Sequence, residues 1–213
     1  MPASEVPPLG QRIRAERLRR DLTLRALARD VGVSASMISQ IETGKAQPSV
    51  STLYAITSIL GMSVQDLFEE PAPAELAGPG AVAVVPRPTG VLAARGAARG
   101  LRLGPLVRPD DRQILTLDSG VTWERLGALP GREIDFLRVT YAPGGTSSST
   151  GDLMRHPGSE YGFLLTGELV LTLGFEDMTL RPGDAVAFDS TTPHRYRNDG
   201  TEPAIGIWYV IED

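Results

Sequence analysis

Residues 23–44 read TLRALARDVGVSASMISQIETG and predict two short helices joined by a tight turn. The apolar residues of the first helix recur three and four positions apart and therefore share one face: Leu24, Leu27, Ala28 and Val31. Gly32 is suited to end this helix, and Ser34 is suited to cap the next one. The second helix turns its own apolar residues inward, namely Met37, Ile38 and Ile41. A connection of about three residues between two such helices is typical of a helix-turn-helix.

Three further helices are predicted around this pair. The first begins near Leu9, with Ile13 on the same face. Its pattern is less regular beyond that point, because Glu16 and Arg17 stand where the next apolar residue is expected. Each of the other two has a serine cap followed by apolar residues: Ser49 with Leu53, Ile56 and Leu60, and Ser63 with Val64, Leu67 and Phe68. Residues 1–70 are therefore expected to form an all-α domain of five helices.

The stretch from residue 9 to residue 68 resembles the phage-repressor-like, or Xre-type, helix-turn-helix over its whole length. The matching landmarks are Arg17, Leu27-Ala28, Gly32-Val33-Ser34, Ile38, Glu42, Gly44, Pro48 and Leu60-Gly61. Their order and spacing make the resemblance specific. Leu24 departs from the pattern, because the family often has a glutamine there that contacts a DNA phosphate.

The resemblance implies that the helix after the turn is a recognition helix, which lies in the major groove of double-stranded operator DNA. The residues it would present to base edges are Ser34, Ala35, Ser36, Ser39 and Gln40. Gln40 is the best reader among them, because its amide can bond adenine at two points. Lys45 and arginines such as Arg25 would contact the phosphate backbone without reading sequence. Two-fold operators would imply a homodimer, and the alternative is a helical domain that serves dimerisation alone.

Charge is distributed unevenly along the chain, whose net charge is −5. Residues 12–45 hold eight Lys or Arg against four Asp or Glu, a balance of +4, whereas residues 71–213 hold 13 basic and 18 acidic residues. A basic part beside an acidic remainder is typical of a protein in which one part contacts phosphates. A solvated helix face explains such arginine clusters about equally well, so charge alone does not decide the question.

Three absences limit the class of protein. The chain has no cysteine, which excludes disulfides, thiolate metal sites and cysteine nucleophiles. It has no apolar run near the roughly 18 residues of a membrane span, and its first residues, MPASEVPPLG, lack the pattern of a signal peptide. These features predict a cytoplasmic protein without a membrane partner.

Beyond the helical part, the apolar residues alternate with a period of two, which indicates β-strands. Residues 71–108 are rich in Pro, Ala and Gly and predict a linker with an irregular entry to the next domain, containing a short strand near Val82–Val85. The alternating rows are Leu137, Val139 and Tyr141; Leu169, Leu171 and Leu173; and Ile205, Ile207, Tyr209 and Ile211, the last row pointing either inward or outward. Turn residues separate these rows, so residues 109–213 are expected to form an antiparallel sandwich or barrel.

Two segments of this region resemble the two motifs of the cupin family. APGGTSSSTGDLMRHPGSEYGFLLTGEL, residues 142–169, resembles the first motif, and LRPGDAVAFDSTTPHRYRN, residues 180–198, resembles the second. The matching positions are His156, Glu160, Gly167, Pro182-Gly183-Asp184, His194 and Asn198. The resemblance implies a double-stranded β-helix, or jelly-roll, barrel. The whole chain is then α+β, with a helix-turn-helix head and a cupin sensor domain, as in the Xre–cupin regulators.

His156, Glu160 and His194 occupy cupin metal-ligand positions, and the two histidines are the only ones in the chain. Two imidazoles and a carboxylate suit a divalent first-row metal, with Fe(II) the usual occupant and Zn, Mn or Ni as alternatives. Met154 stands where the full motif has its first histidine, and a thioether is a poor ligand for such an ion. The alternative is a pocket without metal, in which these three groups hydrogen-bond an organic effector.

Five further residues are candidates for contact with a small-molecule effector inside the barrel: Tyr141, Met154, Tyr161, Phe188 and Trp208. Aromatic residues on strands more often belong to a plain core, and that alternative stays open. The loop that contains PGG and SSST, within residues 143–150, is a candidate lid.

Two functions from different classes fit these features. The first is a sequence-specific transcriptional regulator, whose barrel binds an effector and changes operator affinity, with no catalytic residue. The second is a mononuclear iron enzyme that resembles hydroxypropylphosphonate epoxidase, which also joins a helical head to a cupin. The regulator is favoured, because the recognition-helix segment is retained and no clear clamp for an anionic substrate is present beyond scattered arginines such as Arg138, Arg155 and Arg195.

Overall fold

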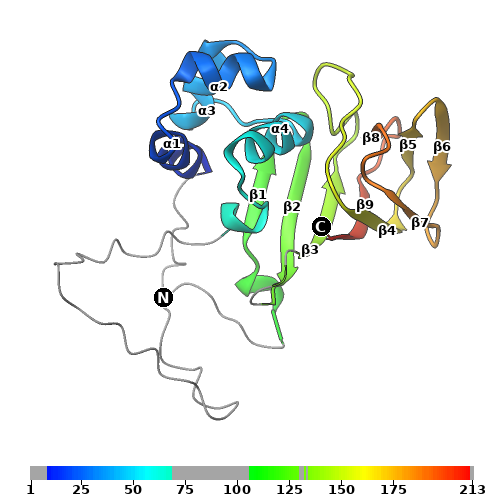
Figure 1. Cartoon of the computed structure of the whole chain (residues 1–213). Coiled ribbons are helices and arrows are strands. Elements are labelled where there is room, and N and C mark those ends of the chain that lie inside the picture. The colour runs from blue at the N-terminus through cyan, green and yellow to red at the C-terminus, as the bar shows by residue number, and fades with distance from the viewer. Residues whose placement is uncertain (1–8, 69–105, 130–131, 133, 212–213) are drawn as a thin grey trace.

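The computed structural model describes residues 9–68, 106–129, 132 and 134–211. Within these ranges, a group of helices precedes an all-β region, as expected (Figure 1). Most of the linker predicted over residues 71–108, including the strand near Val82–Val85, lies outside the described residues. None of the helices described here is long and apolar enough to cross a membrane.

The helical part contains four α-helices among the described residues, not the five that the sequence predicts. They are α1 (Leu9–Arg19), α2 (Leu24–Val31), α3 (Ala35–Glu42) and α4 (Val50–Leu60), followed by the 3-10 helix η1 (Gln65–Leu67). The fifth helix is limited to this single turn. The amide of Ser63 donates to Asp66 and the amide of Asp66 donates to Ser63, so the two side chains cap the start of this turn. The carbonyl of Phe68 then accepts a hydrogen bond from Gln113 of the β region.

The helix-turn-helix has the caps that the sequence predicts. Ser34 precedes α3 and accepts a hydrogen bond from the amide of Met37, at 3.1 Å. Gly32 ends α2 in the left-handed conformation, with φ 83°, which a residue with a side chain rarely adopts. Met37 was expected to face inward and is instead 42% exposed, because α3 packs through the side that carries Ile38 and Ile41.

A buried ion pair explains why Arg17 stands at a position of α1 where an apolar residue was expected. Arg17 lies on the inner side of α1, and its guanidinium donates twice to the Glu42 carboxylate, at 2.5 and 2.8 Å. A third hydrogen bond joins Arg17 to the carbonyl of Leu22, at 2.8 Å. Both charged side chains are buried. Arg17 therefore takes the place of an apolar residue and ties α1 to the end of α3.

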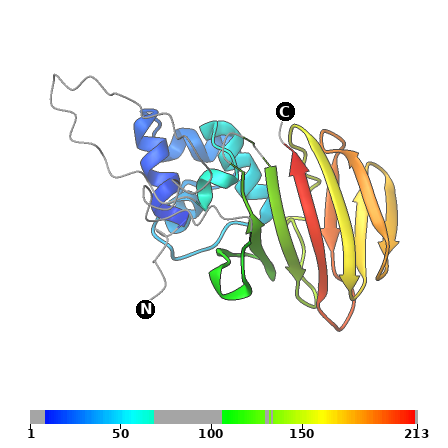
Figure 2. The ribbon, with the colours of Figure 1, turned by 90° about the horizontal axis from the view of Figure 1, so that it is seen from below.

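The β region consists of nine strands among the described residues, after a short 3-10 helix. They are η3 (Pro109–Asp111), β1 (Ile114–Leu117), β2 (Val121–Gly127), β3 (Ile134–Tyr141), β4 (Ser159–Thr166), β5 (Leu169–Leu173), β6 (Glu176–Leu180), β7 (Ala185–Asp189), β8 (His194–Arg197) and β9 (Ala204–Ile211). One sheet has the order β1-β2-β3-β9-β4-β7 and the other the order β6-β5-β8, with antiparallel pairing throughout. Figure 2 shows the large sheet with the helices packed at its β1–β2 side. The predicted all-β barrel is confirmed.

Alternation along the strands separates the barrel interior from its outer face. Leu137, Val139 and Tyr141 of β3 are buried, as the period of two predicts. In β9 the buried residues are the ones that alternate with the predicted row of Ile205, Ile207, Tyr209 and Ile211. They include Trp208 and Val210, whereas Tyr209 is 36% exposed. The row that begins at Ile205 therefore faces outward.

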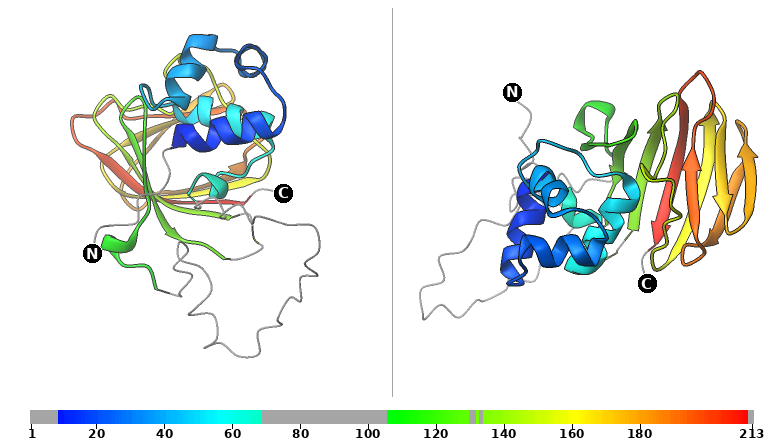
Figure 3. Two further views of the ribbon diagram at one scale, coloured as in Figure 1. Left: turned by 90° about the vertical axis from the view of Figure 1, so that its left-hand side faces the viewer. Right: turned by 90° about the horizontal axis from the view of Figure 1, so that it is seen from above.

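The helices lie across one end of the barrel (Figure 3). The amide of Ser51, in the first turn of α4, donates to the carbonyl of Ser147 at 2.9 Å. The amide of Asp118 donates to the carbonyl of Pro48, also at 2.9 Å. Gln65 of η1 donates to two carbonyls at the start of β3, those of Arg132 and Ile134. Backbone and side-chain hydrogen bonds thus join α4 and η1 directly to the barrel.

Candidate metal and ligand site

His156, Glu160 and His194 meet inside the barrel, and all three are buried. One potential ligand atom from each lies within 4.8 Å of the other two. Glu160 is on β4 and His194 begins β8, whereas His156 is in the loop before β4. That loop is held against β8 by two backbone hydrogen bonds between Met154 and His194, at 2.9 and 2.8 Å. The backbone of Met154 therefore positions the site although its thioether is not part of the group.

The two imidazole rings are oriented by hydrogen bonds at their Nδ1 atoms. Nδ1 of His156 lies 3.2 Å from the carbonyl oxygen of Pro157, and Nδ1 of His194 lies 2.9 Å from that of Thr192. A carbonyl oxygen can only accept, so each Nδ1 carries a proton, and in the neutral imidazole Nε2 is then the atom with the free lone pair. Among the described residues, neither Nε2 has a hydrogen-bond partner, although both are buried.

The Glu160 carboxylate is oriented in the same way. Its Oε1 accepts hydrogen bonds from the hydroxyl of Tyr196 at 2.8 Å and from the indole Nε1 of Trp208 at 2.9 Å. Its Oε2 lies 3.5 Å from Nε2 of His156 and 3.5 Å from Nε2 of His194. The Trp208 ring reaches this position because it crosses Gly162 and Gly206, where a Cβ atom would collide with it.

The charge states of these groups favour a cation. Burial raises the pKa of Glu160, but its interactions with His156, His194 and Tyr196 outweigh burial and place that pKa below its ordinary value. Burial lowers the pKa of His194. The site therefore holds an ionised carboxylate between two buried imidazoles, and a metal ion bound there would replace the protons through which the imidazoles lower the pKa of Glu160.

The spacing of the ligand atoms also fits a metal ion. Two lone pairs aimed at a carboxylate oxygen repel it unless a positive charge lies between them. Ligands about 2.1 Å from a tetrahedral metal are about 3.4 Å apart, close to the separation that Oε2 has from each Nε2. Three protein ligands leave at least one coordination position open for water or an effector.

A cavity of about 330 Å³, including its open mouth, extends from this group. Its lining residues are Val50, Tyr54, Trp123, Leu137, Val139, Tyr141, Met154, Glu160, Tyr196, Trp208 and Val210. The wall is mainly apolar and aromatic, with the carboxylate as its charged group. Much of this volume belongs to the open mouth, and the enclosed part beside Glu160 admits only a group about the size of a water molecule in the conformation described.

Three of the five residues predicted to contact an effector line this cavity, namely Tyr141, Met154 and Trp208. Tyr161 was expected there but is 47% exposed, because it follows the inward-facing Glu160 on β4 and so points to the outer face. Phe188 is half-buried and packs its ring 5.1 Å from that of His194, outside the cavity lining. Phe188 therefore packs against His194, a candidate metal ligand, and does not line the cavity.

Sequence reasoning missed three aromatic residues of the pocket. Tyr196 follows His194 by two positions on β8, so the strand period could have identified it as facing the same side. Trp123 lies on β2 with the same alternation. Tyr54 had no such signal, because it belongs to α4 of the helical part, yet its ring stacks on that of His156 with centroids 4.1 Å apart and an interplanar angle of 3°.

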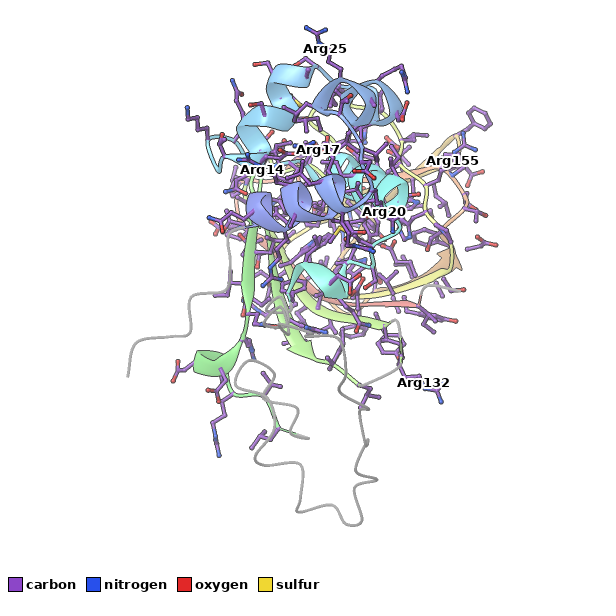
Figure 4. All side chains as sticks on the ribbon, turned by 60° about the vertical axis from the view of Figure 1, so that its left-hand side comes forward. Arg14, Arg17, Arg20, Arg25, Arg132 and Arg155 are labelled. Atoms are coloured by element: carbon purple, nitrogen blue, oxygen red, sulfur yellow. The ribbon has the colours of Figure 1, made fainter. Side chains whose placement is uncertain are left out.

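The residues expected to contact DNA lie on the outer side of the helical part. Ser34, Ser36 and Gln40 are exposed, whereas Ala35 and Ser39 are half-buried. Lys45 is exposed beyond the end of α3, and Arg25 is exposed in the first turn of α2, where Figure 4 shows it pointing away from the barrel. Within α3, the exposed Ser36 and Gln40 alternate with the buried Ile38 and Ile41, so they lie on the solvent-facing side of the helix.

Comparison with known proteins identifies both parts. A helix-turn-helix family model matches residues 13–67, and a cupin domain model matches residues 137–210. The HTH-type transcriptional regulator PuuR of Escherichia coli (strain K12) is 29% identical over 191 residues, which cover 89% of this chain and 86% of that protein. An HTH_3 family transcriptional regulator from Vibrio cholerae is 21% identical with a TM-score of 0.61, covering 97% of this chain and 96% of that one.

A hydroxypropylphosphonic acid epoxidase from S. wedmorenis is 20% identical with a TM-score of 0.43, covering 96% of this chain and 97% of that one. The two family models between them account for the helical part and for most of the barrel. The chain is thus an Xre-type helix-turn-helix protein with a C-terminal cupin domain.

Proposed function

We propose that this chain is a sequence-specific DNA-binding transcriptional regulator whose cupin domain binds a small-molecule effector and modulates operator binding. The observation that carries the proposal is the solvent-facing side of α3, where Ser36 and Gln40 are exposed. The likeness to PuuR over most of both chains supports it. As a homodimer, the protein would place two such helices in successive turns of the major groove.

The cupin site is proposed to hold a divalent metal through His156, Glu160 and His194. The carbonyls of Pro157 and Thr192 fix the imidazole tautomers, and Tyr196 with Trp208 holds the carboxylate. A bound Fe, Zn, Mn or Ni ion would supply positive charge and an open position for an anionic or oxygen-bearing group of the effector. The apolar wall around Tyr141 and Val139 would exclude water from the rest of that molecule.

Two measurements on the same purified protein test this function. Binding to the DNA upstream of its own gene should be tight, should fall steeply with salt, and should protect a two-fold sequence. Elemental analysis should find about one metal ion per chain. DNA binding without sequence preference would contradict the regulator, and DNA binding by a metal-free protein would leave an organic-effector pocket in place of the metal site.

One observation favours a second candidate, a mononuclear iron enzyme. Two histidines and one carboxylate with open positions are the ligand set of many oxygen-activating iron proteins. Stoichiometric iron, oxygen consumption with a small organic substrate, and no operator binding would establish this alternative. Operator binding without oxygen consumption would exclude it.

A further inference from the structure

One wall of the cupin cavity is built by the helix-turn-helix domain. Val50 and Tyr54 lie one turn apart on α4, and both line the cavity beside Met154 and Trp123. The Tyr54 ring stacks face to face on the ring of His156, 4.1 Å away, and meets Trp123 edge-on at 6.0 Å. Tyr54 is only 7% exposed. A residue of the DNA-binding domain thus touches a proposed metal ligand.

The same helix belongs to the core of its own domain. Leu53, Ile56 and Leu60 of α4 are fully buried and pack with the other helices. The first turn of α4 is bonded to the barrel through the amide of Ser51, which donates to the carbonyl of Ser147. A small movement of α4 relative to the barrel therefore carries the helical domain with it, because tightly packed cores transmit displacements instead of absorbing them.

Occupation of the cupin site changes the strength of the stack. A cation on Nε2 of His156 withdraws electron density from the imidazole and makes its ring more positive. The electron-rich face of a phenol attracts such a ring more strongly, as it attracts other cations. Metal therefore favours the arrangement in which Tyr54 is docked on His156, and this differential contact is what a ligand needs in order to shift a conformational equilibrium.

We propose that Tyr54 is the residue through which the cupin site acts on the DNA-binding domain, its stack on His156 holding α4 against the barrel when the site is occupied. The inference rests on the proposed metal site and adds the route by which that site regulates. By reciprocity, DNA that prefers one position of the helical domain changes metal affinity by the same factor.

The Ser51 amide supplies a direct readout, because its hydrogen bond to Ser147 exists only while α4 is docked. Hydrogen exchange at this amide is measured with and without Co²⁺, whose visible absorption reports binding independently. In the natural chain, Co²⁺ should slow exchange about 2- to 12-fold, the range that an aromatic pair contributes. Tyr54→Phe keeps the stack and should keep the slowing. Tyr54→Leu should bind Co²⁺ and show at Ser51 no slowing beyond the overall stabilisation that amides of the barrel also report, and Tyr54→Met provides a second, less disruptive loss of the ring.

Tyr161→Leu is the matched control, because Tyr161 is a tyrosine on the outer face of β4. It should behave as the natural chain does. Equal slowing in Tyr54→Leu and in the natural chain would overturn the role of Tyr54 while leaving the metal site intact. Co²⁺ binding without slowing in the natural chain would overturn it as well. Failure of the natural chain to bind Co²⁺, Zn²⁺ or Fe²⁺ would remove the metal site and the inference together.

Discussion

Each candidate ligand residue of the metal site is oriented by a hydrogen bond at an atom other than the one that would bind the metal. Nδ1 of each histidine is bonded to a carbonyl, and Oε1 of Glu160 is bonded to Tyr196 and Trp208. Each outer contact leaves one ligand atom directed toward the same point. Loss of a partner of this kind commonly lowers metal affinity about 10- to 100-fold.

Replacement of Tyr196 by Phe removes one of the two hydrogen bonds to Oε1 of Glu160 and leaves the ring in place. We expect metal affinity to fall about 10- to 100-fold, because the carboxylate loses part of its orientation. Competition against a chelator of known affinity measures the change. Tyr209→Phe, on the outer face, is the control and should bind metal as the natural chain does. An unchanged affinity in Tyr196→Phe would show that Trp208 alone orients Glu160.

Replacement of Arg17 by Met leaves Glu42 as a buried charge without its partner. We expect the free energy of unfolding to fall by about 3–5 kcal/mol, the usual result of breaking one side of a buried pair. Arg19→Met is the matched control, because Arg19 pairs with Glu16 on the surface of the same helix and should change little. Urea unfolding of both variants measures the difference, and equal stabilities would mean that water reaches the Arg17–Glu42 pair.

At the scale of elements, the sequence predicts the helices and strands well where local rules determine them. Ser34 caps α3 and Gly32 ends α2 as predicted, because both effects are confined to a few neighbouring residues. The strand period separated the two faces of β9 but could not say which face was inside. The structure decides this through Trp208, whose ring crosses Gly206 and is directed at Glu160.

Within α3, Gln40 is expected to read a base and Lys45, just beyond it, to contact a phosphate. Gln40→Ala should relax sequence preference at one base step, at a cost of about 1–3 kcal/mol on the preferred operator. Lys45→Ala should instead weaken binding to all sequences. It should also reduce the slope of log binding constant against log salt concentration by about one unit. Selection from randomised operators separates these effects. An unchanged preference in Gln40→Ala would remove Gln40 as a base reader.

At the scale of the whole molecule, the contact between the helical domain and the barrel lay beyond sequence reasoning. Tyr54 and His156 are separated by about a hundred positions, and no local pattern connects a helix of one domain with a loop of the other. The metal group could be predicted because cupin motifs place its residues at fixed spacing. The aromatic wall contributed by α4 could not, since it depends on how the domains pack.

Metal should stabilise the folded chain as a whole, because its three ligands come together only after folding. At a free metal concentration about 100-fold above the dissociation constant, the free energy of unfolding should rise by about 2.7 kcal/mol. Thermal unfolding with Zn²⁺ and with a chelator measures this, and His194→Ala should abolish the difference. Both tryptophans of the chain line the cavity, so their fluorescence should change during the same titration. A melting temperature independent of metal would contradict the site.

Occupation of the cupin site is proposed to govern operator binding. The most direct test is the affinity of the full chain for its own upstream DNA, measured by fluorescence anisotropy at one fixed salt concentration with the site loaded and with it stripped. We expect the two dissociation constants to differ about 5- to 150-fold, the usual range of coupling between sites. Identical affinities for a specific operator in the two states would contradict the claim.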